Sequence, residues 1–162
     1  MHKKTSLIRP LSPEDVKATA KLWHDGWHEA HDHLIPPYPP HERSLECFER
    51  RLLGTQDQAR IAFDHDQPVA LCITEQNEVA QLFVTKLQRG THLGKSLLID
   101  AEKRIKQNSF TRAWLTVVVG NAPARIFYER CGWAVVSTLD VDLSGIRKDS
   151  ASLEMWRLEK DI

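Results

Sequence analysis

Residues 84–96 read VTKLQRGTHLGKS and join a predicted strand to the start of a predicted helix. Two glycines, Gly90 and Gly94, lie in this stretch, and glycine lets a ligand approach the backbone closely. The unpaired N–H groups and the dipole of a helix start attract anions. Residues 86–106 also hold six Lys and Arg but only two Asp and Glu. The stretch therefore predicts a site for a phosphate-bearing ligand; the alternative is a glycine turn beside a solvated helix face.

Two better-known phosphate motifs do not fit this stretch. A nucleotide-binding P-loop needs four residues between its first glycine and its Gly-Lys pair. Three residues separate Gly90 from Gly94, and no acidic candidate for a magnesium ligand follows the next predicted strand, residues 113–119. The dinucleotide fingerprint G-x-G-x-x-G is absent from the sequence as well. The phosphate prediction thus depends on the loop and the helix start alone.

The flanking sequence predicts a mixed α/β fold. Apolar residues recur at helical spacing around residues 16–27, 45–52 and 93–105, and a shorter helix is predicted at about 123–130. Seven strands are predicted, at residues 7–9, 59–63, 69–73, 79–84, 113–119, 135–139 and 153–158. Four prolines within residues 33–41 predict a stiff polyproline-like loop. The strand–helix–strand order of residues 79–119 predicts a right-handed parallel crossover inside an otherwise antiparallel sheet.

The composition is typical of one globular domain, which we expect to cover residues 1–162. Hydrophobic residues make up 41% and charged residues 27% of the chain. Lys+Arg and Asp+Glu both number 22, which argues against a nucleic-acid partner, since such proteins carry a basic excess. The longest apolar run, residues 69–73, is too short to span a membrane, and no signal-peptide pattern opens the chain. The three cysteines lack metal-type spacing, so we expect a reduced, cytoplasmic protein with no membrane association.

A second motif follows the predicted strand at 113–119: residues 121–133 read NAPARIFYERCGW. This motif and the first stretch, in this order and separated by one helix and one strand, resemble the GNAT (Gcn5-related N-acetyltransferase) family. The family's loop motif is Q/R-x-x-G-x-G/A, where Arg89 stands first, Gly94 last and His92 in place of the middle glycine. The family's second motif, N-x-x-A-x-x-F-Y followed by G-F/W, is matched by Asn121, Ala124, Phe127, Tyr128, Gly132 and Trp133. The predicted element order is similar along essentially the whole chain.

The resemblance implies a GNAT-like fold and transfer of an acetyl group from acetyl-coenzyme A to a primary amine, without a metal. In the family the strand at 79–84 splays from that at 113–119, and pantetheine enters the gap. Backbone groups there would polarise the thioester carbonyl, because fixed N–H donors stabilise an oxyanion. The pyrophosphate would lie on residues 89–95, and Asn121 would contact the pantetheine arm or fix the strand-to-helix turn. The implied coenzyme site comprises Phe83, Val84, Arg89, Gly90, Thr91, His92, Leu93, Gly94, Lys95 and Asn121.

The resemblance also implies two roles in proton transfer. Tyr128 resembles the family's general acid, because a phenol with a pKa of about 10 holds a proton at neutral pH and can give it to the departing thiolate. Glu78 stands at the start of the splayed strand, where some family members place a carboxylate base. A water chain or a histidine is the alternative to Glu78 as the base.

Five of the eight histidines lie between residues 24 and 41. His24 and His28 are one helical turn apart and could both ligate a metal, although the spacing is not that of zinc proteases. In the family this segment walls the acceptor pocket, so the resemblance implies Trp27, His28, His31 and Tyr38 as acceptor contacts. A neutral histidine there could also be the base.

Several functional alternatives stay open at this point. The first is an acetyltransferase whose acceptor is a small-molecule or peptide amine. The second is a domain that binds or senses acyl-coenzyme A without catalysis, and the third is a histidine-rich metal-binding protein. The resemblance allows a homodimer, but no interface can be read from the sequence.

Overall fold

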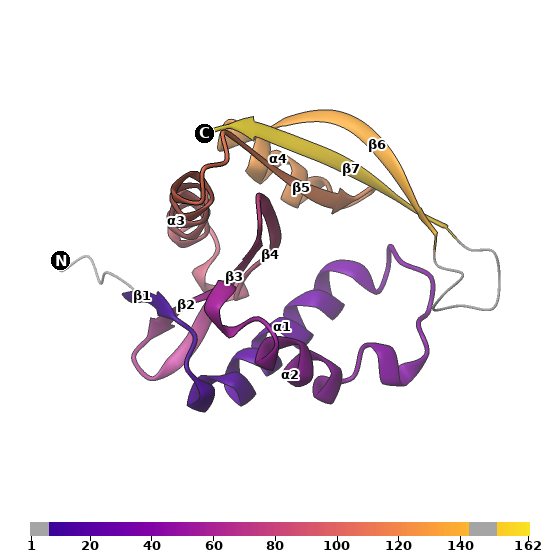
Figure 1. The fold of residues 1–162 in the computed structure, drawn as a ribbon. Coiled ribbons are helices and arrows are strands. Elements are labelled where there is room, and N and C mark those ends of the chain that lie inside the picture. Colours follow the sequence, from indigo (N-terminus) through magenta and orange to yellow (C-terminus); the bar gives the residue numbers. More distant parts are fainter. Residues whose placement is uncertain (1–6, 143–151) are drawn as a thin grey trace.

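All seven predicted strands pair into one sheet in the computed structural model, which describes residues 7–142 and 152–162 (Figure 1). Their order in the sheet is β1-β2-β3-β4-β5-β7-β6, and the β4–β5 pair is parallel while the other pairs are antiparallel. The predicted mixed fold is therefore confirmed. The strands are β1 (Leu7–Pro10), β2 (Ala59–Asp64), β3 (Gln67–Glu75), β4 (Glu78–Val84), β5 (Arg112–Val118), β6 (Ala134–Asp142) and β7 (Ser152–Asp161).

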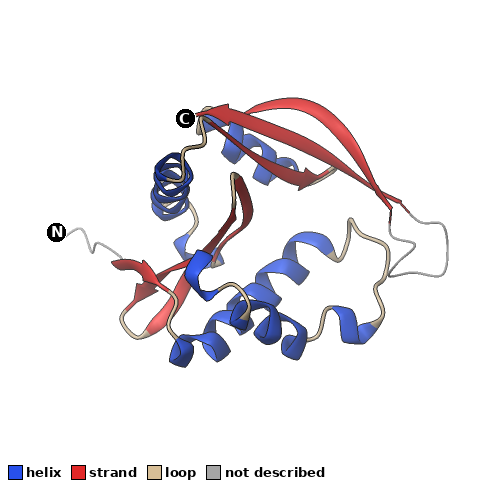
Figure 2. Cartoon of the chain, viewed as in Figure 1, coloured by secondary structure: helices blue, strands red, loops and turns tan. Residues whose placement is uncertain are grey.

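The helices cover both faces of this sheet (Figure 2). They are α1 (Val16–His31), α2 (Leu45–Leu53), α3 (Leu93–Gln107) and α4 (Ala122–Arg130). Short 3₁₀ turns lie at Pro13–Asp15, Pro40–Glu42, Gln56–Gln58 and Lys86–Gln88. The proline segment thus ends in a 3₁₀ turn, where the sequence predicted only an extended loop. In the described ranges, no helix has the length and apolar character needed to cross a membrane.

Strand β3 shows why the sheet needs helices on both sides. Its successive side chains point to opposite faces, as in any strand. Leu71 and Ile73 pack in the cluster that includes α1 and α2, whereas Ala70 and Cys72 pack in the cluster that includes α3. All four are at most 3% exposed. A run of apolar residues with no polar face therefore becomes a strand covered on both faces.

Strands β4 and β5 touch only at one end. Their ladder contains a single residue pair, Glu78 with Trp114. Asn77 secures this closed end: its carbonyl accepts from the backbone N–H of Trp114 at 3.0 Å. The Asn77 side chain donates to the carbonyl of Arg112 at 3.0 Å and accepts from the indole N–H of Trp114 at 3.2 Å. Beyond this point β4 runs toward α1 while β5 follows β7, so the strands splay as predicted (Figure 1).

The last two strands are longer than the sequence predicts. β6 extends to Asp142 and β7 from Ser152 to Asp161, because the hairpin continues as a paired ladder past the apolar residues that mark it. β6 is the edge strand, and its side chains are mostly exposed. Period-2 patterning is weak in a strand that faces solvent on most sides.

Candidate active site

The floor of the candidate site is the unpaired edge of β4. Between the pairs Ile73–Gln81 and Thr74–Val79 the register shifts by one, so Ala80 is an extra residue in β4. Such a bulge bends a strand and redirects its backbone groups. Past Glu78 the edge of β4 that faces β5 has no ladder partner within the described residues. Phe83 and Val84, two residues of the predicted coenzyme site, lie on this stretch and are half-buried. No pattern in the sequence signals the bulge.

The start of α3 offers free backbone donors beside this edge. His92 is its N-terminal flanking residue, and no side chain caps the helix there. In contrast, Ser44 caps α2 and Asn121 caps α4. The first N–H groups of α3, from Leu93 to Lys95, thus have no carbonyl partner within the helix. Lys86, Arg89 and Lys95 are exposed around these donors, so the loop has the charge and the geometry to bind an anion.

The glycines of this loop serve different purposes. Gly90 has φ +79°, and no atom lies within 4 Å of where its Cβ would be, so the backbone is open to a ligand. Gly94 is a packing glycine: a Cβ there would lie 3.4 Å from Phe127 Cζ and 3.4 Å from Val84 Cγ2. The start of α3 therefore fits closely between the end of β4 and α4. Thr91 closes the turn by donating from its hydroxyl to the carbonyl of Gln88 at 2.6 Å.

Arg89 connects the loop to α1. Its Nη1 donates to Glu29 Oε1 at 2.9 Å, and its Nε donates to the carbonyl of Val84 at 3.2 Å. The hydrogen bond from Arg89 lowers the pKa of the Glu29 carboxyl. Glu29 is a site residue that the sequence did not indicate, because sixty residues separate it from its partner.

Tyr128 lies on α4 in the apolar cluster that also contains Val79 of β4 and Val117 of β5. Its ring packs edge-on against Phe127 and Trp133, with centroids 5.1 and 6.3 Å away. Burial raises its pKa far above the ordinary value, and Cys72 and Cys131 add to this effect. Its hydroxyl has no hydrogen-bond partner among the described residues. The phenol therefore stays protonated at neutral pH.

Asn121 occupies the turn between β5 and α4. Its side-chain oxygen accepts from the backbone N–H of Ala124 at 3.4 Å and so caps α4. The sequence left two roles open for Asn121, and the structure shows the turn-fixing one.

The last turn of α1 and the following loop cross from β4 to β5. Gly26 allows α1 to approach β4, since a Cβ there would lie 3.0 Å from Phe83 Cδ1. The His31 ring lies 6.5 Å from the Phe83 ring. Leu34 reaches the end of β5, where a Cβ on Gly120 would meet Leu34 Cδ2 at 2.9 Å. The predicted acceptor segment therefore covers the open end of the splayed strands.

His31 and His28, on α1, have different chemistry. His31 Nδ1 lies 2.9 Å from the carbonyl of Trp27, so this nitrogen carries the hydrogen and Nε2 keeps a free lone pair. Burial lowers the pKa of His31, which keeps the ring neutral. His28 faces acceptors on both sides, the Asp32 carboxylate at 2.8 Å and the Arg43 carbonyl at 2.9 Å. Both ring nitrogens of His28 thus lie within hydrogen-bond distance of groups of the protein itself, unlike those of His31.

The histidine cluster does not form a metal site where the structure describes it. The rings of His24 and His28 lie 4.5 Å apart, but each is hydrogen-bonded to an aspartate, Asp25 and Asp32. In the described part of the chain, no group of three or more His, Cys, Asp and Glu could hold a metal ion. The residues present do not support the metal-binding alternative.

Glu78 lies at the closed end of the strand pair. Burial raises its pKa, the neighbouring Glu75 raises it further, and Arg157 opposes the shift. At about 3.3 Å per residue, Glu78 stands roughly 16 Å along β4 from Phe83. A carboxylate at that distance acts on an amine near Phe83 only through a relay of waters.

Comparisons with known proteins agree with this architecture. The model of the acetyltransferase (GNAT) family matches residues 22–133. A GCN5-related N-acetyltransferase structure from Rhodopseudomonas palustris is similar over 100% of this chain and 99% of its own, with a TM-score of 0.73 and 20% identity. The PaiA N-acetyltransferase of Thermoplasma acidophilum, solved in complex with coenzyme A, covers 98% of this chain and 99% of its own, with a TM-score of 0.72 and 20% identity.

A third similar structure is that of an enzyme named for a protein acceptor. The ribosomal-protein-alanine N-acetyltransferase of Brucella melitensis covers 96% of this chain and 99% of its own, with a TM-score of 0.70 and 16% identity. No curated protein matches the chain significantly. The family model covers more than half of the residues. The structure has the seven-stranded mixed sheet described above. The chain therefore belongs to the GNAT acetyltransferase family.

Proposed function

We propose that this protein transfers the acetyl group of acetyl-coenzyme A to a primary amine by direct attack. The observation that carries the proposal is the single-pair contact of β4 and β5 beside an uncapped helix start. The first feature leaves an unpaired strand edge for the pantetheine arm, and the second leaves donors for the pyrophosphate. No other part of the described chain combines the two.

The chain's own groups account for each proton and charge in the transfer. The amine nitrogen attacks the thioester carbonyl carbon, and N–H donors on the free edge of β4 stabilise the oxyanion that forms. The carbon–sulfur bond then breaks, and Tyr128 gives its proton to the thiolate. The attacking amine loses one proton to a base while the thiolate gains one from Tyr128, so the number of protons is the same before and after the transfer.

We assign the base to His31 rather than Glu78. A base must reach the amine directly or through one water. The His31 ring lies 6.5 Å from Phe83 and has a free Nε2, whereas Glu78 stands at the closed end of the pair. Burial lowers the pKa of His31 by more than the hydrogen bond to the Trp27 carbonyl and the charge of Asp32 raise it, which favours the neutral ring at pH 7.

The pH dependence separates the two bases. A base must be deprotonated, so kcat/KM should rise with pH as His31 loses its proton, with a midpoint below the ordinary histidine value of about 6.5. His31→Gln should remove this acidic limb and lower the rate, and Glu78→Gln should leave the limb in place. If Glu78→Gln removes the limb and His31→Gln does not, the base is Glu78.

Tyr128→Phe tests the transfer itself. Loss of a general acid should reduce kcat by about 10²–10⁴-fold, measured as thiol release with a panel of amines. Coenzyme A binding, measured by calorimetry, should be unchanged, because the phenol ring stays. The hydroxyl has no partner to lose, so the melting temperature should stay within a few degrees. Coenzyme A binding by the wild-type protein without thiol release from any amine would instead favour the non-catalytic sensing domain.

A further inference from the structure

The Glu29–Arg89 ion pair lies where the coenzyme loop, the end of β4 and α1 meet. Arg89 Nη1 donates to Glu29 Oε1 at 2.9 Å, and Arg89 Nε donates to the carbonyl of Val84 at 3.2 Å. The Val84 side chain adjoins the start of α3, because a Cβ on Gly94 would lie 3.4 Å from Val84 Cγ2. The Arg89 guanidinium is therefore held at the strand end that adjoins the free backbone donors of the loop.

Glu29 contributes a negative charge to a group that is otherwise cationic. Lys86, Arg89 and Lys95 are exposed around the start of α3. The hydrogen bond from Arg89, together with the charges of Arg89 and Lys86, lowers the pKa of the Glu29 carboxyl. The carboxyl is therefore ionised at neutral pH. In the free protein, a carboxylate of α1 thus occupies an arginine of the loop where we expect a diphosphate.

A carboxylate and a phosphate bind the same N–H donors of an arginine. Arg89 Nη1 is occupied by Glu29, so Arg89 can present this donor to a phosphate only after it releases Glu29. The two side chains are 50% and 49% exposed, and ion pairs with such exposure are weak. A diphosphate carries more charge than one carboxylate and also binds the backbone donors of α3. The diphosphate therefore displaces Glu29 at a small cost.

We propose that Glu29 competes with the diphosphate of the coenzyme for Arg89: it holds Arg89 in the free protein and releases it when the coenzyme binds. This inference rests on the proposed function, because the displacing ligand is acetyl-coenzyme A or the coenzyme A product. Either molecule has to break the Glu29–Arg89 pair, so Glu29 weakens the binding of both. The pair forms again when coenzyme A leaves, and Glu29 thus favours release of the product.

Calorimetry of Glu29→Gln tests the competition. Coenzyme A should bind to this variant about two- to fivefold more tightly than to the wild type, which is the value of an exposed ion pair. Inorganic pyrophosphate should show the same gain. Pantetheine, which has no phosphate, should bind equally to both proteins. Glu46→Gln removes the same charge from an exposed position of α2 and should leave coenzyme A binding unchanged.

Arg89→Gln identifies the group for which Glu29 competes. This variant should bind coenzyme A more weakly, and adding Glu29→Gln to it should no longer tighten the binding, because the contested arginine is gone. The pKa of Glu29, followed by carbon-13 NMR of its carboxyl, reports the exchange directly. It should lie below the ordinary value in the free protein and rise when coenzyme A or pyrophosphate binds, because the ligand takes Arg89 away and brings negative charge.

Equal or weaker binding of coenzyme A by Glu29→Gln would overturn the proposal, and weaker binding would mean that Glu29 orients Arg89 for the phosphate. A gain of the same size in the Arg89→Gln background would overturn it too. If the wild type binds no coenzyme A, the proposed function fails, yet tighter binding of pyrophosphate by Glu29→Gln still supports the competition. Pyrophosphate binding that is equal in both proteins, or absent from both, would then refute it.

Discussion

His92 has the left-handed backbone conformation, φ +69° and ψ −1°, at the start of α3. Such a conformation costs a residue with a side chain about 1–3 kcal/mol, and glycine avoids the cost. The family pattern has glycine at this position, so the departure noticed in the sequence is a strained residue in the structure. The conformation is maintained by the turn around it, where Ser96 donates to the His92 carbonyl from its backbone at 3.0 Å and its hydroxyl at 3.1 Å.

His92→Gly should stabilise the protein. Relief of the strain outweighs the greater flexibility of glycine in the unfolded chain, for a net gain of about 1 kcal/mol, or roughly 2–4 °C in melting temperature. Chemical and thermal unfolding measure both values. His92→Ala keeps a Cβ in the left-handed region, so it should not share the gain. A melting temperature of His92→Gly at or below that of the wild type would contradict this account.

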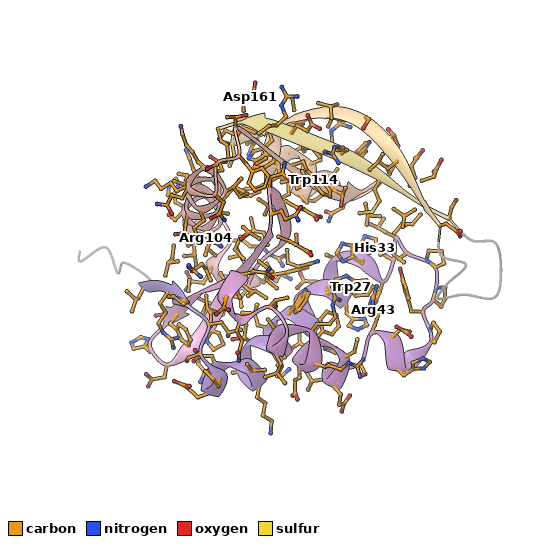
Figure 3. The ribbon with its side chains drawn as sticks, viewed as in Figure 1. Trp27, His33, Arg43, Arg104, Trp114 and Asp161 are labelled. Carbon is orange, nitrogen blue, oxygen red and sulfur yellow. The ribbon has the colours of Figure 1, made fainter. Side chains whose placement is uncertain are left out.

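Strands β4 and β5 keep their splay because their contact is confined to one end. Asn77 makes three hydrogen bonds across that end, two of them from its side chain. The other partner of this contact is Trp114, which is labelled in Figure 3. The guanidinium of Arg157 lies 4.2 Å from the centre of the Trp114 ring. A ladder that ends after one pair needs such additional contacts, because β4 and β5 share so little backbone pairing.

Asn77→Ala should weaken this closed end. It removes two side-chain hydrogen bonds, each worth about 0.5–1.5 kcal/mol, so the free energy of unfolding should fall by about 1–3 kcal/mol. Urea unfolding gives the value. Asn77→Asp keeps the oxygen that accepts from Trp114 but loses the donor to Arg112, and it should fall between the wild type and Asn77→Ala. Equal stability of all three proteins would mean that the splay does not depend on Asn77.

The molecule as a whole consists of two sets of strands around the candidate site. β1 to β4 with α1 and α2 lie on one side, and β5 to β7 with α4 lie on the other (Figure 1). α3, Asn77 and the Leu34–Gly120 contact connect them. A ligand between the splayed strands contacts both sets, which exist in this arrangement only in the folded state. Binding is therefore coupled to the stability of the whole protein.

Coenzyme A at about 100 times its dissociation constant should add about 2.7 kcal/mol to the free energy of unfolding. For a protein of this size that shifts the melting temperature by roughly 5–10 °C. Amides of β4 and β5 should exchange hydrogen more slowly in the same sample. Zinc at equal concentration serves as the comparison and should give no shift. A zinc shift without a coenzyme A shift would favour the metal-binding alternative instead.

Much of the fold could be predicted because it depends on local periodicity. Residues 93–105 have one apolar stripe, and residues 69–73 are apolar throughout, so the helix and the doubly covered strand follow from the side chains alone. The loop at 89–95 was predicted as an anion site for the same reason, since its glycines, cations and helix start are neighbours in sequence. The proline segment and Tyr128 were likewise visible as motifs.

Only the tertiary structure decided the contacts between residues that lie far apart in the chain. The Glu29–Arg89 ion pair, the bulge at Ala80 and the buried, unpaired Nε of Arg43 depend on how whole elements pack, and no local pattern encodes them. Gly26 is an example: in sequence it only weakens a helix, while in space it allows Phe83 to pack against α1. Periodicity is a property of a segment and can be read along the chain, whereas a close approach or an unpaired donor exists only once two segments meet.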